Sequence, residues 1–296
     1  MFAEHVRFLA ENGCDGVCPN GSLGEYQTLS DEERGRVIET AVQASPAEFT
    51  VMAGAAAYGA ARDRLIPIAQ RESHLPRARL TGELGRTTFQ LRLHADEIES
   101  GRPFDVRIDH ADPAWGMGPR PDLRRVNVPL GPVVVFAASN FPFAFSVAGG
   151  DTSAALAAGC PVVLEAHPGH PRLSDATGDV VAAALHADGA PSGVFAVVHG
   201  DEAGRVALLD PRITAGAFTG SVRVGRILFD LAVSRPVPIP FFGDLGSVNP
   251  VFVTRAAAAA RAEAIVDGFI GSYTLGAGQF CTKPGLLFVP ADSEIP

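Results

Sequence analysis

The chain has 296 residues, 47% of them hydrophobic and 19% charged, which is enough for one large or two medium domains with a sizeable core. Its net charge of −9 argues against nucleic acid or an anionic membrane as a main partner. The four cysteines form no dense framework and no signal peptide is visible, so we expect a reducing, cytoplasmic location. Cys14 and Cys18 have a C-x3-C spacing with no His or Cys cluster at zinc spacing after them, so we expect no metal site.

The first sixty residues predict elements of βα type. After an initial helix, residues 15–29 predict a strand that runs into a polar glycine loop. Ser30 and Glu33 form a capping box at the start of the next helix. A strand over 49–61 then runs into small residues, and we expect the joint to the rest of the chain between residues 56 and 64.

The longest uncharged stretch, residues 126–150, has the length of a membrane span. Its prolines, its asparagines and its closing pair of glycines do not suit a helix in a bilayer. A buried parallel strand, a loop and the start of a helix fit this stretch better.

From this stretch onward, short apolar runs alternate with helical segments. The predicted strands cover 133–139, 160–167, 193–200, 214–220 and 237–246, and the predicted helices cover 144–159, 173–189, 201–210 and 221–233. Such alternation indicates βαβ units and a parallel sheet. Because these sheets bind ligands at the carboxyl ends of their strands, Asn140, His167, Gly220 and Asp244 are candidate site residues.

Five stretches carry a resemblance to a known family: "RARLTGELGRTTFQLR", "PLGPVVVFAASNFPFAFSVAGGDTSAALAAGCPVV", "AFTGSVRVGRILFDLA", "DLGSVNPVFV" and "GAGQFCTKPG". From about residue 64 to residue 290, the chain resembles the aldehyde dehydrogenase superfamily, and most closely its branch that oxidises 2-oxoglutarate semialdehyde. In contrast, "NGSLGEYQTLSDEER" is similar to a glycine loop and helix of the dihydrodipicolinate synthase and lyase family, which residues 1–58 resemble.

The two resemblances imply an α/β chain in three parts. Residues 1–60 resemble a βα fragment of a TIM barrel, residues 61–246 a Rossmann-like parallel sheet of an aldehyde dehydrogenase NAD(P)-binding domain, and residues 247–296 the start of a catalytic domain with its cysteine loop. We therefore expect a join of two incomplete genes that lacks the start of a dehydrogenase and whatever follows the cysteine loop. Uncovered apolar surface would then lead the chain to self-associate.

The resemblance implies a catalytic set of three residues. Cys281 matches the nucleophile, whose thiolate attacks the aldehyde carbon. Asn140 matches the asparagine whose amide holds the oxyanion, a donor whose loss typically costs about a hundredfold or more. Asp244 stands where the family has a glutamate as general base, so its carboxylate is one methylene shorter. A misplacement on the order of 1 Å can cost about a hundredfold.

The resemblance also implies a site for NAD or NADP. Gly220 and Ser221 match the turn where a helix N-terminus meets the pyrophosphate, since its exposed N–H groups favour an anion. Glu165 replaces a lysine that contacts the adenosine ribose or its 2′-phosphate, and His167 follows on the same strand end. A carboxylate at this place accepts a bond from a ribose hydroxyl but repels a phosphate, so we expect NAD to be favoured.

On the substrate side, Arg86 and Gln90 are four residues apart on one face of a predicted helix. In the semialdehyde branch, a guanidinium at this place would suit the distal carboxylate of the substrate. The alternative is a surface arginine on a mixed helix. The implied reaction is NAD(P)-dependent oxidation of a small semialdehyde through a thioester, and the alternatives are a Schiff-base lyase or dehydratase and a non-catalytic fusion product.

Overall fold

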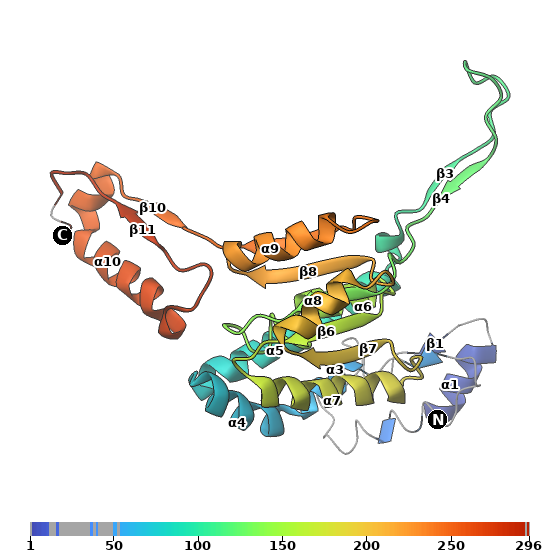
Figure 1. Ribbon diagram of the computed structural model, residues 1–296, viewed down its shortest axis with the longest axis horizontal. Helices are drawn as coiled ribbons and strands as arrows, with labels where there is room; N and C mark the ends of the chain where they lie inside the picture. The colour runs from blue at the N-terminus through green and yellow to red at the C-terminus, as the bar shows by residue number, and fades with distance from the viewer. Residues whose placement is uncertain are drawn as a thin grey trace.

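The computed structural model describes residues 2–11, 16–17, 36–37, 40, 50–51, 54–293 and 295. Its centre is a five-stranded sheet with strand order β7-β6-β5-β8-β9, in which all neighbouring strands are parallel (Figure 1). The strands are β5 (Val133–Phe136), β6 (Val162–Ala166), β7 (Phe195–His199), β8 (Ala215–Gly220) and β9 (Phe241–Leu245). The predicted α/β fold with a parallel sheet is confirmed, and each strand lies within its predicted range.

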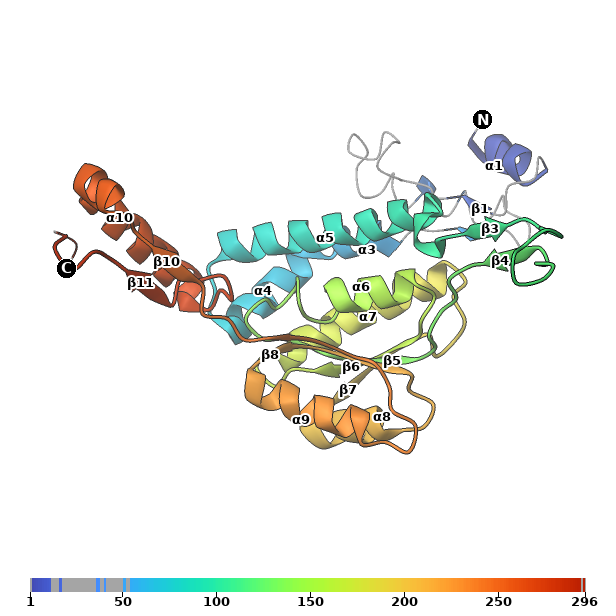
Figure 2. The same ribbon diagram turned by 90° about the horizontal axis from the view of Figure 1, so that it is seen from above.

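Helices cover both faces of this sheet (Figure 2). One face carries α6 (Gly150–Ala157) and α7 (Pro171–Ala187), and the other carries α8 (Asp201–Leu209) and α9 (Val222–Val233). A Cβ atom at Gly225 would lie 2.1 Å from Leu245, so the glycine allows α9 to approach β9 closely. The apolar side chains of the central strands are buried between these helices, as expected for a parallel sheet covered on both faces.

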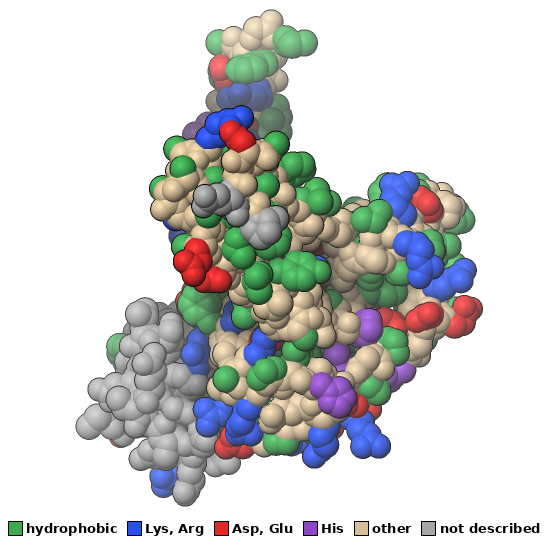
Figure 3. Space-filling model, turned by 90° about the vertical axis from the view of Figure 1, so that its left-hand side faces the viewer, with side chains coloured by type: hydrophobic (Ala, Val, Ile, Leu, Met, Phe, Trp, Pro, Cys, Tyr) green, Lys and Arg blue, Asp and Glu red, His purple; other side chains and the backbone are tan. Residues whose placement is uncertain are grey.

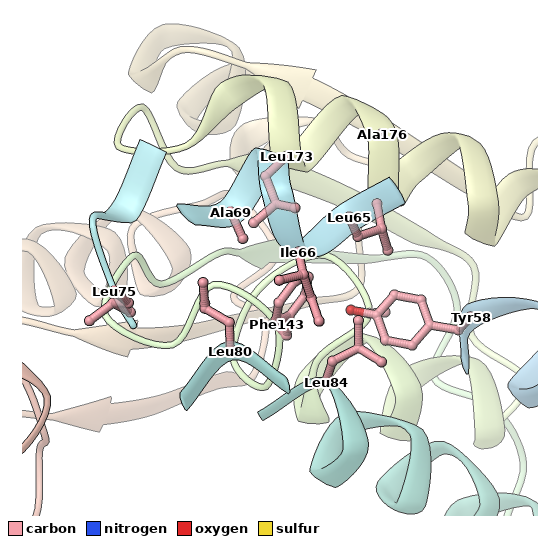
Figure 4. Packing of buried hydrophobic residues seen from close by; sticks show 11 residues of the cluster. Tyr58, Leu65, Ile66, Ala69, Leu75, Leu80, Leu84, Phe143, Leu173 and Ala176 are labelled. Atoms are coloured by element: carbon pink, nitrogen blue, oxygen red, sulfur yellow. The ribbon is translucent and has the colours of Figure 1, made fainter. Parts of the chain in front are cut away.

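An outer layer of helices packs on α6 and α7. It consists of α3 (Gly54–Ala60), α4 (Arg62–Ser73) and α5 (Arg77–Glu99). Tyr58 of α3 is 1% exposed and packs edge-on against Phe143, with ring centroids 6.4 Å apart, inside the apolar cluster of Figure 4. The small residues after β2 thus form a helix, whereas the sequence predicted that the strand runs into them. This helix packs in the core of the sheet domain although it precedes the boundary expected at residue 60.

The helix predicted over 144–159 begins only at Gly150. The carboxylate of Glu83, on α5, accepts hydrogen bonds from the backbone N–H groups of Phe143 (2.8 Å) and Ala144 (3.0 Å). These amides therefore have partners outside a helix, and the segment 140–149 forms turns. The predicted helix start was wrong because a buried side chain from another helix satisfies the backbone here.

Two segments extend from the body at opposite ends (Figure 1). The first is a hairpin of β3 (Arg107–Asp109) and β4 (Leu123–Arg125), which follows the short 3-10 helix η2 (Arg102–Phe104). The second contains the parallel pair β10 (Pro250–Phe252) and β11 (Leu286–Phe288), joined through α10 (Arg255–Thr274) and the 3-10 helix η3 (Leu275–Gly278). Both segments expose hydrophobic side chains (Figure 3), such as Met117 on the hairpin and Phe252 near the C-terminus.

In the first sixty residues the structure describes α1 (Phe2–Glu11) and a parallel pair, β1 (Gly16–Val17) with β2 (Thr50–Val51). The predicted initial helix is confirmed, and the pair of parallel strands agrees with βα type. Cys14, Cys18 and the capping box of Ser30 and Glu33 lie outside the described residues. No helix in the described part of the chain has both the length and the apolar character that crossing a membrane requires.

We propose that the exposed apolar surface of the C-terminal segment leads the chain to self-associate. Phe252 and Phe288 stack at 4.9 Å between ring centroids and are 72% and 49% exposed. Size-exclusion chromatography with light scattering should give a mass that rises with concentration above that of one chain, and replacing both phenylalanines with serine should lower it. The matched control Val206→Ser, on α8, should change nothing. A single-chain mass at every concentration would contradict the proposal.

Candidate active site

A cavity of about 920 Å³ lies along the carboxyl ends of the sheet strands. It opens where the chain order of the strands reverses, between β5 and β8, which is where open α/β sheets bind ligands. Its volume is within the usual range for small-molecule and cofactor sites. Seven of the nine predicted site residues line this cavity, namely Asn140, Glu165, His167, Gly220, Ser221, Asp244 and Cys281.

The turn from β8 into α9 forms one wall of the cavity. A Cβ atom at Gly220 would lie 2.5 Å from the ring of Phe218, so only glycine fits this turn without displacing the ring. Ser221 is the N-cap of α9, and its hydroxyl accepts a hydrogen bond from the N–H of Val224 at 3.3 Å. The free N–H groups of the first turn and the helix dipole make this wall suitable for a pyrophosphate.

The loop that carries Cys281 is fixed to the segment after β9. The carbonyl oxygen of Cys281 accepts hydrogen bonds from the hydroxyl of Ser247 and from the amide of Asn249, whose amide also donates to the carbonyl of Lys283 at 3.0 Å. Cys281 itself is exposed, whereas Cys160, two residues before β6, is buried. The one thiol is therefore open to a ligand in the cavity and the other is enclosed in the core.

Asn140 joins the end of β5 to the cysteine loop. Its side-chain amide donates a hydrogen bond to the carbonyl of Gln279 at 2.8 Å. One amide N–H is thus engaged, and the second is left for a ligand oxygen near Cys281. The structure thereby brings together the residue expected to stabilise an oxyanion and the expected nucleophile.

Asp244 is on β9, directly opposite Thr219 of β8, and its side chain is exposed at the cavity. Burial raises the pKa of Asp151, on α6, and the negative charge of Asp244 raises it further. Asp244 and the loop that carries Cys281 line the same cavity. This is the place where the sequence predicted a general base.

Glu165, near the end of β6, lines the cavity. It is only 6% exposed, and its Oε1 atom is buried without a hydrogen-bond partner. Burial, and to a smaller extent the charge of Asp201, raise its pKa from 4.5 to about 7, while His199 lowers it. The carboxyl group is thus unusually easy to protonate and has a free acceptor, as a ribose hydroxyl would require.

His167 is two residues beyond Glu165 on the same strand end. Its Nδ1 accepts a hydrogen bond from the N–H of Gly169 at 3.0 Å. Burial and the neighbouring His170 lower its pKa, so the ring is neutral at pH 7. His170 is buried, and its Nε2 donates a hydrogen bond to the carbonyl oxygen of Ala138 at 3.2 Å. This bond stabilises the chain just after β5.

The structure does not bring Arg86 and Gln90 into the cavity. The guanidinium carbon of Arg86 lies 5.0 Å from the ring centroid of Phe145, and neither residue lines the cavity. Gln90 packs against the start of α6, where a Cβ atom at Gly150 would meet its amide nitrogen at 2.9 Å. Their assignment to a substrate site stays a prediction.

Several residues of the cavity escaped sequence reasoning. Ser247 and Asn249 anchor the cysteine loop, and their signal was a polar pair just past a strand end. Arg205, on α8, and Arg223, on the first turn of α9, also line the cavity. Within the residues that the structure describes, no three or more His, Cys, Asp or Glu side chains gather as metal ligands.

Comparison with known proteins identifies the family. Residues 42–294 match the aldehyde dehydrogenase family. The chain belongs to this family. Residues 1–63 match the dihydrodipicolinate synthetase family, so both expected resemblances are confirmed.

Two curated relatives belong to the expected branch. Alpha-ketoglutaric semialdehyde dehydrogenase 2 of Azospirillum brasilense is 52% identical over 229 residues, which cover 76% of this chain and 43% of the relative. Alpha-ketoglutaric semialdehyde dehydrogenase of Acinetobacter baylyi is 48% identical over 224 residues, with the same 76% and 43% coverage. The chain therefore spans less than half the length of either relative.

Solved structures agree on the fold. Glyceraldehyde-3-phosphate dehydrogenase GapN from Methanocaldococcus jannaschii, solved in complex with NADP, superposes with a TM-score of 0.66 at 18% identity. The match covers 97% of this chain and 53% of that protein. The aldehyde dehydrogenase family uses NAD or NADP. The glycine at position 220 and the N-terminus of α9 give the cavity a wall that fits the pyrophosphate of either cofactor.

The raised pKa of Glu165 predicts a pH-dependent stability. Because its pKa is about 7 in the folded chain against 4.5 ordinarily, the folded state binds the proton more tightly. This stabilisation is complete below about pH 4.5 and is lost as the pH rises through about 7. Glu165→Gln should therefore unfold at higher urea than the unmutated chain at about pH 8, by up to about 3 kcal/mol, and differ little at about pH 5.

Urea titrations of both proteins at the two pH values check this. Glu202→Gln, an exposed neighbour on α8, is the matched control and should have little effect at either pH. Equal stability of Glu165→Gln and the unmutated chain at about pH 8 would show that Glu165 carries no unfavourable buried charge.

Proposed function

We propose that this chain binds NAD or NADP and oxidises a small semialdehyde, of the 2-oxoglutarate semialdehyde type, to its carboxylate through a thioester on Cys281. The observation that carries the proposal is a single cavity lined by Cys281, Asn140, Asp244 and the N-terminus of α9. The names of the two curated relatives support the choice of aldehyde.

In the first step, the thiolate of Cys281 attacks the aldehyde carbon and forms a carbon–sulfur bond. The carbonyl electron pair moves onto oxygen, where the second amide N–H of Asn140 stabilises the negative charge. The exposed position of Cys281 lets the aldehyde reach the sulfur from the cavity.

In the second step, the thiohemiacetal carbon gives up a hydride and becomes a thioester. The bound nicotinamide ring supplies the hydride acceptor. The wall at Gly220 and Ser221 would hold the pyrophosphate of the cofactor, and Glu165 would accept a hydrogen bond from its adenosine ribose hydroxyl.

In the third step, a water molecule attacks the thioester, and the carboxylate product and the free thiol are released. Asp244 takes the proton from this water. Because the aspartate side chain is one methylene shorter than a glutamate, its carboxylate reaches less far from β9 toward the sulfur. Hydrolysis of the thioester is therefore the slow step.

The substrate carboxylate would lie toward Arg86. A row of aromatic rings leads from Arg86 to the cysteine loop: Phe145 packs edge-on against Phe141 with centroids 5.2 Å apart, and Phe141 against Phe280 at 5.0 Å. The single carboxylate of the semialdehyde would then point from Cys281 toward the side of the cysteine loop on which these rings and Arg86 lie.

A Schiff-base lyase is less well supported. The match to the dihydrodipicolinate synthetase family ends at residue 63, and this part contains no lysine. The one lysine of the sequence, Lys283, is two residues after Cys281, where its ammonium group lies 4.4 Å from the ring centroid of Tyr273.

The proposed reaction needs a thiol that stays reduced, which supports a cytoplasmic location as part of the proposal. Cell fractionation would test this location.

A rapid-mixing assay of reduced nicotinamide with 2-oxoglutarate semialdehyde tests the proposed function. The unmutated chain should show a fast first turnover followed by a slower steady state, because hydrolysis limits the cycle. Cys281→Ser should abolish both phases, and Asn140→Ala should slow the first turnover by about a hundredfold or more. Cys160→Ser is the matched control. Turnover that survives Cys281→Ser, or a chain that binds no nucleotide, would refute the proposal.

The acidic end of the cavity predicts the choice of cofactor. Glu165 and Asp201 should disfavour a 2′-phosphate, so calorimetric titration should give tighter binding of NAD than of NADP. The difference should grow as the pH rises past about 7, where Glu165 loses its proton. Glu165→Lys should strengthen NADP binding more than NAD binding, while Glu202→Lys, outside the cavity, should not. Tighter binding of NADP by the unmutated chain would show that Arg205 and Arg223 outweigh the carboxylates.

A further inference from the structure

Glu83 of α5 is a buried carboxylate that the proposed reaction does not use. Its side chain is 3% exposed, and Oε1 accepts hydrogen bonds from the N–H groups of Phe143 and Ala144, three and four residues after Asn140. Burial raises its pKa, while the two N–H bonds and the nearby arginines lower it. Glu83 thus fixes the turns that follow Asn140.

Arg79, one helical turn earlier on α5, supplies the opposite charge. Its guanidinium is 3.5 Å from the second carboxylate oxygen of Glu83, and its side chain is 11% exposed. The same guanidinium donates a hydrogen bond to the carbonyl oxygen of Asn140 at 2.9 Å. One cation therefore holds the backbone of the oxyanion residue and balances the carboxylate that holds the following turns.

Arg79 also contacts the cysteine loop. Its guanidinium carbon lies 4.7 Å from the ring centroid of Phe141 and 4.3 Å from that of Phe280, the residue before Cys281. A flat guanidinium packs on both rings at once, which an ammonium group cannot do in the same way.

The turn before Cys281 is shaped to admit this arginine. Gly276 has a φ of +58°, which favours glycine, and a Cβ atom there would lie 2.2 Å from Nη1 of Arg79. The left-handed backbone and the short distance to the guanidinium are two separate reasons why position 276 needs a glycine. The first glycine of "GAGQFC" is explained by Arg79 and not by a ligand.

We infer that Arg79 is a positioning residue that, with Glu83, sets the placement of Asn140 relative to Cys281 by joining the end of β5 to the cysteine loop. Arg79 does not line the cavity and touches neither substrate nor cofactor. The inference rests on the proposed roles of Asn140 and Cys281. It differs from a general stabilising role because both loops depend on the same side chain.

Two measurements on the full chain test this inference. Hydrogen exchange of residues 140–145 and 276–283 reports the two loops without any aldehyde. The second measurement is the rate at which iodoacetamide labels Cys281, with and without 2-oxoglutarate semialdehyde. Slower labelling in the presence of the aldehyde reports that the thiol of Cys281 and the amide of Asn140 still bind one carbonyl group together. Arg79→Met should increase exchange in both loops together and raise the aldehyde concentration for half-protection about tenfold or more.

The remaining variants separate positioning from folding. Arg79→Lys keeps a charge beside Glu83, so it should fold and still show faster exchange in both loops. In an Asn140→Ala background, Arg79→Met should weaken protection no further, because the two residues act as one unit. Arg64→Met, which removes a surface arginine paired with Asp179 on α7, is the matched control and should change neither measurement.

The possible outcomes are distinct. If the unmutated chain gives no aldehyde protection, the proposed function fails and hydrogen exchange alone decides the inference. If Arg79→Met and Arg79→Lys leave both loops unchanged, change only one of them, or loosen α3, α4 and α5 equally, Arg79 does not set the placement of Asn140 and Cys281.

Discussion

The hydrogen bonds between the carbonyl of Cys281 and the side chains of Ser247 and Asn249 are the constraint on which the site depends. Cys281 follows the sheet by 36 residues of a segment that extends away from the body, so nothing in the parallel sheet itself brings the thiol back. Asn249, which has a left-handed φ of +49°, holds both Cys281 and Lys283 and thereby returns the loop to the end of β9. The cavity between the cysteine loop and the end of β9 depends on these hydrogen bonds.

Two buried glutamates show how the fold distributes its charge. Oε1 of Glu83 accepts two N–H bonds, and Oε2, which has no hydrogen-bond partner, lies 3.5 Å from the guanidinium of Arg79. A nearby cation thus balances the charge, and the turns after Asn140 are fixed. Glu165, which lines the cavity, is also buried, and its Oε1 has no hydrogen-bond partner. Its burial raises its pKa to about 7. The ion pair of Glu83 stabilises the turns beside the cysteine loop, whereas the unpartnered oxygen of Glu165 faces the cavity residues and is suited to accept a hydrogen bond from a ligand.

The parallel sheet and the residues at its strand ends could be predicted from the sequence because apolar runs such as 133–136 repeat at βαβ spacing. Asn140, His167, Gly220 and Asp244 follow from that alternation alone, since each stands at a carboxyl end, whereas Glu165 follows only from the family resemblance. The late start of α6 could not be predicted, because it depends on Glu83 reaching the amides of Phe143 and Ala144 from sixty residues away. The roles of Ser247 and Asn249 likewise depend on contacts across more than thirty residues, which no local pattern encodes.

The central claim is that Cys281 carries the acyl group while it is oxidised. The most direct measurement mixes the chain with 2-oxoglutarate semialdehyde and NAD, stops the reaction with acid within the first turnover, and identifies the modified peptide by mass spectrometry. The account predicts the mass of one acyl group on the peptide that contains Cys281 and none on the peptide that contains Cys160. Reduced nicotinamide formed without an acylated Cys281 peptide, or an acyl group on another residue, would contradict it.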